Sequence, residues 1–211
     1  MRTDDLIAEL AAKPWPATRP AIRLAFAMVV GWVAALAGLI IALGPPLAAV
    51  GETGAMPFAL KLGYTTALTL ITAALALAVG MPGQRLGTRS LLVGLPIAII
   101  AAAATLELAP IPMLAWDGLM FGSTFTTCVS AISIASMPVL AAVIWATRVL
   151  APTRLMLAGF ISGLSAGAAG AAAYALYCPE TTASFLMASY TPGILIPAVV
   201  GAILGPRLLR W

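Results

Sequence analysis

The sequence contains no histidine and very few charged residues. Histidine is the commonest acid–base residue at neutral pH and a frequent zinc ligand, so its absence removes the usual forms of both chemistries. Charged residues make up 9% of the chain, against about 25% in an ordinary soluble domain. No polar stretch is long enough to form a soluble catalytic domain. The sequence therefore predicts that the protein is not an enzyme.

Apolar residues make up 62% of the 211 residues, more than a soluble fold of this size can bury. A helix needs about 20 apolar residues to cross the hydrocarbon core of a bilayer. Six runs approach or reach that length: residues 24–43, 62–79, 91–108, 124–146, 155–177 and 184–204. Proline and glycine separate the runs. The predicted fold is all-α, with an amino-terminal segment (1–23), a six-helix transmembrane domain (24–205) and a short tail (206–211).

The basic residues predict how the chain is oriented. All but one of the 11 lysines and arginines flank the same ends of these runs. They are Arg2, Lys13, Arg19, Arg23, Arg85, Arg89, Arg148, Arg154, Arg207 and Arg210. Only Lys61 falls on the opposite side. Because short cytoplasmic loops carry the excess of lysine and arginine, both termini are predicted to be cytoplasmic.

The amino-terminal segment has the pattern of a short amphipathic helix. Asp4 and Asp5 stand in its first turn, where they favour the helix dipole. Leu6, Ile7 and Leu10 form one apolar face. So short a helix is stable only when docked. It either lies on the membrane surface or binds a soluble cytoplasmic partner. Its acidic residues favour the second reading, since membrane-surface helices are usually basic.

The chain has two cysteines, Cys128 and Cys178, near the non-cytoplasmic ends of the fourth and fifth runs. A short turn joins these runs, which predicts antiparallel neighbours, and the two residues differ in depth by roughly 6 Å at 1.5 Å per residue. Helix tilt can absorb this difference, so a disulfide is feasible. The alternative is two independent thiols packed among the helices. Cysteine also suits soft metal ions, which makes the same pair the candidate metal ligands.

Glycine recurs every four residues along the fifth run, at Gly159, Gly163 and Gly167. This spacing places all three on one face and allows a second helix to approach closely. The pattern serves packing within one chain and packing between two chains equally well.

Three short motifs resemble a known family. They are Thr3-Asp4-Asp5-Leu6-Ile7-Ala8-Glu9-Leu10, then Ala151-Pro152-Thr153-Arg154 with Ala173-Tyr174-Ala175-Leu176-Tyr177-Cys178-Pro179-Glu180, and the ending Leu208-Leu209-Arg210-Trp211. With six helices in about 210 residues, the chain resembles the NrsF family (negative regulator of sigma F), membrane anti-sigma factors of proteobacteria.

The resemblance implies an inner-membrane regulator that sequesters an extracytoplasmic-function (ECF) sigma factor and releases it under redox or metal stress. Cys128 and Cys178 would sense the signal. The sigma factor would bind the amino-terminal helix, through Asp4, Asp5, Leu6, Ile7 and Leu10. Neither a resident cofactor nor direct contact with nucleic acid is expected, and a soft metal would enter only as the signal. Many members of that family carry histidine where this chain has Tyr177, and if that histidine activates the thiol or binds metal, sensing differs in this chain.

The alternative from the residues alone is a small transporter or channel for a metal ion or an organic solute. That reading requires a polar, water-accessible path between the helices. The predicted spans offer threonines, serines and peripheral acids, but no charged residue at mid-membrane depth. The regulator is therefore the leading prediction, and no small-molecule substrate is expected.

Overall fold

The computed structural model describes residues 3, 5, 19–45, 55–81, 87–180 and 182–210, and these residues form helices and no strand. The long helices are α2 (Pro20–Leu43), α4 (Ala55–Gly80), α5 (Gly94–Leu108), α7 (Phe125–Arg148), α8 (Leu155–Tyr174) and α10 (Thr191–Leu208). Short elements join or extend them: η1 (Gly87–Val93), η2 (Met113–Ala115), α6 (Trp116–Phe121), α9 (Ala183–Phe185) and η3 (Leu186–Tyr190).

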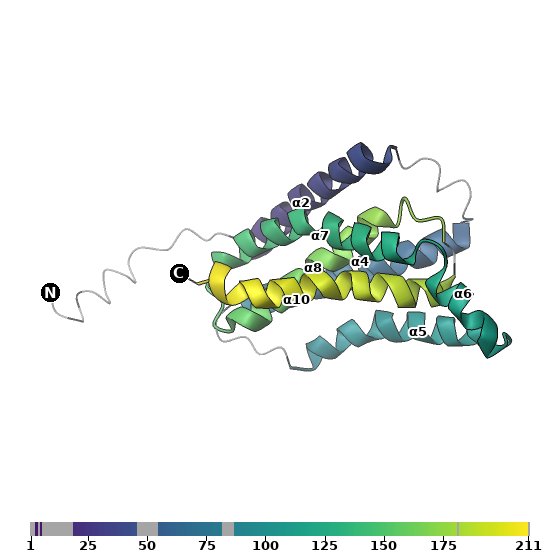
Figure 1. Ribbon diagram of the computed structural model, residues 1–211. Coiled ribbons are helices and arrows are strands. Elements are labelled where there is room, and N and C mark those ends of the chain that lie inside the picture. The colour runs from purple at the N-terminus through teal and green to yellow at the C-terminus, as the bar shows by residue number, and fades with distance from the viewer. Residues whose placement is uncertain are drawn as a thin grey trace.

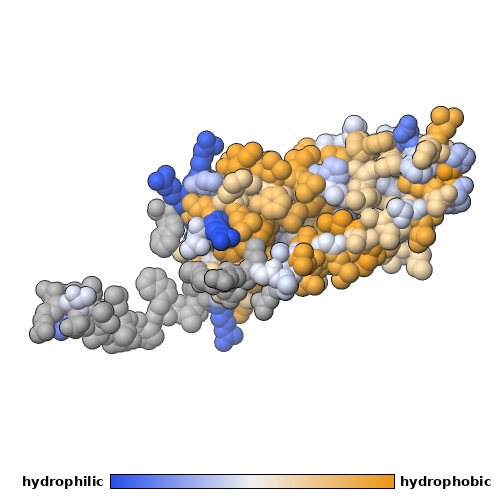
Figure 2. Space-filling model, turned by 90° about the horizontal axis from the view of Figure 1, so that it is seen from below, coloured by the Kyte–Doolittle hydropathy of each residue, from blue (hydrophilic) through white to orange (hydrophobic). Residues whose placement is uncertain are grey.

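Six helical stretches are long and apolar enough to cross a membrane, which confirms the predicted all-α, six-helix membrane protein. They are Pro20–Leu43, Met56–Gly80, Ser90–Leu108, Met113–Arg148, Leu155–Tyr174 and Ala183–Leu208. Figure 2 shows apolar side chains over most of the length of the bundle, with strongly hydrophilic ones gathered near its ends. Large apolar side chains such as Phe26, Ile41 and Leu70 are exposed. A bilayer is the solvent that suits such a surface.

Helix α8 is the centre of the bundle, and α10, α7, α4 and α2 all contact it (Figure 1). Every residue from Ile161 to Tyr174 is buried. Alanine, glycine and serine dominate this stretch, so the helix is thin enough for four neighbours to reach it. A helix that is apolar on all sides is the kind that becomes fully buried.

Helices α2 and α5 lie at the periphery. Helix α2 packs on α7 along one seam and then diverges from it, as Figure 1 shows. At the crossing, a Cβ atom on Gly31 would lie 2.7 Å from the Cα of Val139, so the backbones touch there. Where the helices diverge, a groove of about 390 Å³ opens between them. Helix α5 rests mainly on α9 at one edge of the bundle.

The glycine face of α8 lies against α10 of the same chain. A Cβ atom on Gly167 would come within 2.6 Å of the Ile194 carbonyl oxygen, and Gly159 and Gly163 meet the α10 backbone in the same way. Gly201 and Gly205 of α10 face α8 reciprocally. The two backbones therefore touch at three successive turns of α8, from Gly159 to Gly167.

Three boundaries differ clearly from the predicted ones. Helix α4 begins at Ala55, before the predicted start at residue 62, which places Lys61 inside the helix. The prediction began the span just after the charge of Lys61, but the long aliphatic part of a lysine side chain packs well within an apolar helix. Helix α8 ends at Tyr174, before the predicted end at 177, so Cys178 lies in the link to α9. Helix α10 continues to Leu208, beyond the predicted domain end at 205.

We expect Gly163→Ala to destabilise the protein, because the added methyl would strike the α10 backbone. Overpacking of this kind costs about 1–3 kcal/mol. The measurement is the thermal unfolding midpoint of the purified protein in detergent. Gly38→Ala is the matched control, since open space surrounds Gly38 on α2. Equal midpoints for the two variants would contradict the close α8–α10 seam.

Candidate functional site

The two cysteines meet at one end of the bundle, called here the cysteine end. Cys128 lies in the first turn of α7 and Cys178 in the link after α8, and their Sγ atoms are 3.7 Å apart. Both are free thiols. Cys128 is 0% exposed and Cys178 1%. The structure thus places the two predicted sensing residues in direct contact.

The backbone after α8 holds Cys178 in place. The chain keeps winding past Tyr174, since the Cys178 N–H donates to the Tyr174 carbonyl at 3.2 Å before Pro179 ends the winding. Residues four apart on such a turn share a face. Accordingly, the Tyr174 hydroxyl lies 3.5 Å from the Cys128 sulfur, so Tyr174 and Cys178 both face α7.

Lys61 is the third member of the site. Its ammonium group donates a 2.8 Å hydrogen bond to the Cys178 carbonyl oxygen, across 117 residues of sequence. The side chain is 1% exposed, although it carries the charge of a lysine. Thr65, one turn further along α4, donates to the Lys61 carbonyl at 2.9 Å. A buried lysine is costly unless something compensates its charge, so its position beside the thiols requires an explanation.

Tyr190 closes the site from the side of the last span. It ends η3, a single wide turn of π-helix, a feature that is frequent at functional sites. Its hydroxyl lies beside Cys178 and makes no hydrogen bond within the described part of the chain. The hydroxyl of Tyr177, the residue before Cys178, is also buried and makes no hydrogen bond with the described residues.

Two carboxylates tie the surrounding segments together. Glu180 accepts a 3.0 Å hydrogen bond from the Thr124 hydroxyl, which joins the cysteine link to the start of α7. Glu107, near the end of α5, accepts from the Ser184 N–H at 2.9 Å and from its hydroxyl at 2.6 Å. Charge-assisted bonds of this kind are the stronger class. The link that carries Cys178 is therefore anchored on both sides.

The site favours thiol chemistry. The hydrogen bond with Cys128 and the charge of Lys61 lower the pKa of the Cys178 thiol to about 6, although burial acts in the opposite direction. A disulfide requires sulfurs at about 2.05 Å, so the pair would have to close by about 1.7 Å. No group of three or more histidine, cysteine, aspartate or glutamate side chains forms a metal centre among the described residues.

The predicted sigma-binding residues fall almost entirely outside the described residues. Asp4, Leu6, Ile7 and Leu10 are among those not described, and Asp5 is helical and exposed. Their proposed role therefore rests on the sequence pattern alone.

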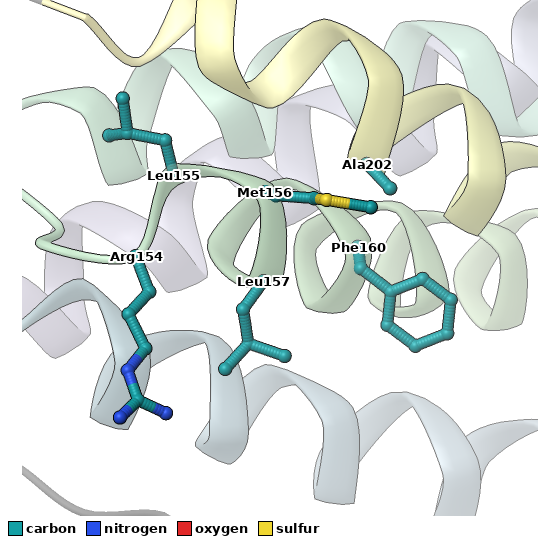
Figure 3. Close-up of a pocket in the computed structure, with 6 residues that line it drawn as sticks. All are labelled: Arg154, Leu155, Met156, Leu157, Phe160 and Ala202. Carbon is teal, nitrogen blue, oxygen red and sulfur yellow. The ribbon is translucent and has the colours of Figure 1, made fainter.

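A separate hollow lies at the opposite end of the bundle, where α8 begins (Figure 3). Its volume is about 420 Å³, and its lining comes from the first turns of α8 with one residue of α10. Of the described residues that line it, Arg154 is the charged one; the others are Leu155, Met156, Leu157, Phe160 and Ala202. Among these described residues no set of polar groups converges on the hollow, as it would at a specific binding site.

Sequence reasoning found the cysteines but missed Lys61 and Tyr190. Lys61 was assigned to the boundary of a span, and a long-range contact with Cys178 leaves no local signal. One sequence feature did point to Lys61: it is the one basic residue predicted on the side opposite the other ten. Tyr190 could not have been found by helical periodicity, because the wide turn of η3 shifts the register of the following residues.

The fold and the site together define a class of protein: a membrane protein of six spans, with two buried thiols and a lysine in contact at one end. The family model described as "NrsF: Negative regulator of sigma F" matches residues 10–211. A probable anti-sigma-F factor NrsF from Azospira oryzae is 38% identical over 213 residues, and the anti-sigma-F factor NrsF of Caulobacter vibrioides is 36% identical over 219. Both alignments cover 100% of each chain.

The chain therefore belongs to the NrsF family, as its motifs predicted. No solved structure matches it significantly.

We expect a mild oxidant to convert the pair into an intramolecular disulfide, because the sulfurs are already in contact. The measurement is the mass added by a maleimide reagent after denaturation, which should fall from two labels to none and return after reduction. Cys128→Ser and Cys178→Ser serve as controls, each retaining one label. Persistent labelling of both thiols in the oxidised wild-type protein would contradict the observed proximity.

Proposed function

We propose that this protein is an anti-sigma factor that holds an ECF sigma factor at the bacterial inner membrane and releases it when Cys128 and Cys178 form a disulfide. Membership of the NrsF family supports the regulatory role, and the 3.7 Å contact between two free thiols supports the trigger. A regulator of this kind needs no catalytic set and no small-molecule substrate.

The distribution of charge supports the orientation that we propose. The start of α2, the turn between α7 and α8 and the end of α10 all lie at the end opposite the cysteines (Figure 1). The described arginines of these segments are Arg19, Arg23, Arg148, Arg154, Arg207 and Arg210. By the positive-inside rule this end faces the cytoplasm, together with both termini. The cysteine end then faces the periplasm, where disulfides form and persist.

The amino-terminal segment is the sigma-binding element that we propose. Leu6, Ile7 and Leu10 would bury their face in a groove of the sigma factor, and Asp4 and Asp5 would pair with basic groups at its rim. Because the segment precedes α2 directly, a sigma factor bound to it stays beside the cytoplasmic end of the bundle.

Oxidation is the trigger that we favour over metal capture. Two thiols offer a soft metal ion only two sulfur donors, and the described residues contain no larger cluster of ligands. A disulfide, in contrast, needs nothing beyond the pair. To turn a mostly bound sigma factor into a mostly free one, the signal must bias the equilibrium by about 5 kcal/mol.

Three buried hydroxyls in the described spans count against the transporter alternative. The buried hydroxyls of Thr72, Ser136 and Ser189 each donate to a carbonyl of their own helix at 2.6 Å. They are therefore satisfied locally rather than aligned along a path for a solute.

We expect a Leu6→Asp, Leu10→Asp double variant to lose the sigma factor, because each change buries a charge in the proposed interface. The measurement is affinity purification of the full-length protein from membranes, with bound proteins identified by mass spectrometry. The matched control is Ala8→Asp, Ala12→Asp, which adds the same charge to the opposite face of the predicted helix. Equal recovery of sigma factor from both variants would move the binding element elsewhere. Recovery of none with the intact protein would overturn the anti-sigma role.

We expect the Cys128→Ser, Cys178→Ser double variant to keep its sigma factor when peroxide is added, whereas the wild-type protein releases it. The reason is that only the wild-type pair can form the disulfide. The measurement is the fraction of sigma factor remaining on washed membranes before and after oxidation, with a reductant added to test reversal. Release from the serine variant at the wild-type level would exclude these cysteines as the sensor.

A further inference from the structure

Lys61 is a buried cation with few hydrogen-bond partners among the described residues. Among the groups of the described residues, its ammonium makes one hydrogen bond, to the Cys178 carbonyl, and the other two hydrogens have no such partner. The described arginines of the turns and helix ends lie at the opposite end of the bundle, so Lys61 is the positive charge of the described cysteine end. An ammonium with one neutral acceptor in an apolar interior is destabilising, unless an anion forms nearby.

Three groups lie near the Lys61 charge. Cys178 and Glu180 come from the link after α8, and Cys128 comes from α7. Tyr190 of η3 is a further neighbour of Cys178. The Glu180 carboxylate is already engaged by Thr124. The sulfur of Cys178 is therefore the atom at which a negative charge would be compensated best by the Lys61 ammonium.

We propose that Lys61 is a positioning residue that makes Cys178 the attacking thiol of the pair, with Cys128 as the resolving thiol. The inference rests on the redox switch proposed above and names the residue that controls its rate. The hydrogen bond to the Cys178 carbonyl fixes the link against α4 and holds the charge next to the sulfur. Lys61 takes no part in the bonds that form or break.

The reaction balances with a hydroperoxide as oxidant. The Cys178 thiolate attacks one peroxide oxygen, so the S–O bond forms, the O–O bond breaks, and the leaving oxyanion takes up the proton that the thiol lost. Cys128 then attacks the sulfenic sulfur, so the S–S bond forms, and the S–O bond breaks. Hydroxide leaves as water with the Cys128 proton. Two electrons pass from the two sulfurs to the peroxide.

The pKa of Cys178 agrees with this assignment. The hydrogen bond with Cys128 lowers it most and the Lys61 charge lowers it further, so both favour the thiolate of Cys178. The Cys128 thiol is placed to donate to that sulfur, at 3.7 Å, and thereby keeps its own proton until the second step. An unperturbed thiol, with a pKa of about 8.5, would be only a few per cent ionised at pH 7.

The test is the rate of disulfide formation by hydrogen peroxide as a function of pH, in proteoliposomes of the full-length protein without any sigma factor. We compare the wild-type protein with Lys61→Met, which removes the charge and keeps the length of the side chain, and with Lys61→Arg, which keeps the charge. Thr72→Val, on the same buried face about three turns along α4, is the control for a disturbed helix.

We expect the midpoint of the rate profile to lie about one pH unit higher for Lys61→Met than for the wild-type protein, because the variant loses the Lys61 charge but keeps the hydrogen bond between Cys128 and Cys178. A less acidic thiolate is intrinsically more nucleophilic, which offsets part of the loss. Lys61→Met should therefore be about threefold slower at pH 5 yet at least as fast as wild type at pH 9. Lys61→Arg and Thr72→Val should follow the wild-type profile.

Two results would overturn the inference. One is a Lys61→Met profile with the wild-type midpoint, which would mean that the charge has no influence on the thiol. The other is a Lys61→Met rate that stays slow at pH 9, which would indicate lost packing instead of a lost charge. Both are independent of the anti-sigma role, because the assay contains no sigma factor. Release of sigma factor without oxidation would instead refute the switch and leave the chemistry of Lys61 intact.

Discussion

The close approach of α8 to its neighbours is the constraint on which the rest of the structure depends. Because alanine, glycine and serine line α8, its axis can lie near four other helices at once. The α10 backbone fits into the glycine face at Gly159, Gly163 and Gly167. On another face, a Cβ on Gly170 would lie 2.9 Å from the Ser136 backbone nitrogen, which fixes the distance between α7 and α8. Since α7 carries Cys128 and α8 leads into Cys178, this small-residue packing sets the distance between the sulfurs.

The same packing restricts which segments could move if the two sulfurs formed a disulfide. The α8–α10 seam involves backbone on both sides and has no room to slide, since interiors of this density are bistable rather than continuously deformable. Closure of the sulfurs by about 1.7 Å must then move the link that carries Cys178 or the first turn of α7. Movement of the link alters the bond between Lys61 and the Cys178 carbonyl. Movement of α7 acts on α2, which touches it at Gly31 and leads directly from the amino-terminal segment. Both routes connect the thiols to the rest of the bundle through contacts that the structure contains.

The outline of this structure could be predicted from the sequence, and the reasons are physical. Hydrocarbon thickness fixes the length of a span, so apolar run lengths identified all six helices. The four-residue spacing of glycine identified the face of α8 that meets another helix, although not which helix. The short turn between α7 and α8 made contact between Cys128 and Cys178 feasible, but the sequence left two separately packed thiols as an equal alternative. Lys61 could not be assigned, because its partner is 117 residues away and nothing in the local pattern distinguishes a buried lysine from one at a span boundary. Tyr190 was hidden by the π-turn, which breaks the periodicity that sequence reasoning uses.

Lys61 also explains how two thiols in an apolar setting can be poised to react. Burial alone would hold both sulfurs in the protonated, unreactive form, since desolvation disfavours the thiolate. In the mechanism that we propose, the Lys61 charge adds to the hydrogen bond between Cys128 and Cys178, and the two together favour the thiolate of Cys178. The charge is held by a backbone carbonyl rather than by a carboxylate, and a carboxylate in that position would have neutralised its effect on the sulfur. Lys61, the one basic residue predicted on the opposite side from the others, is therefore placed where its charge can stabilise the Cys178 thiolate.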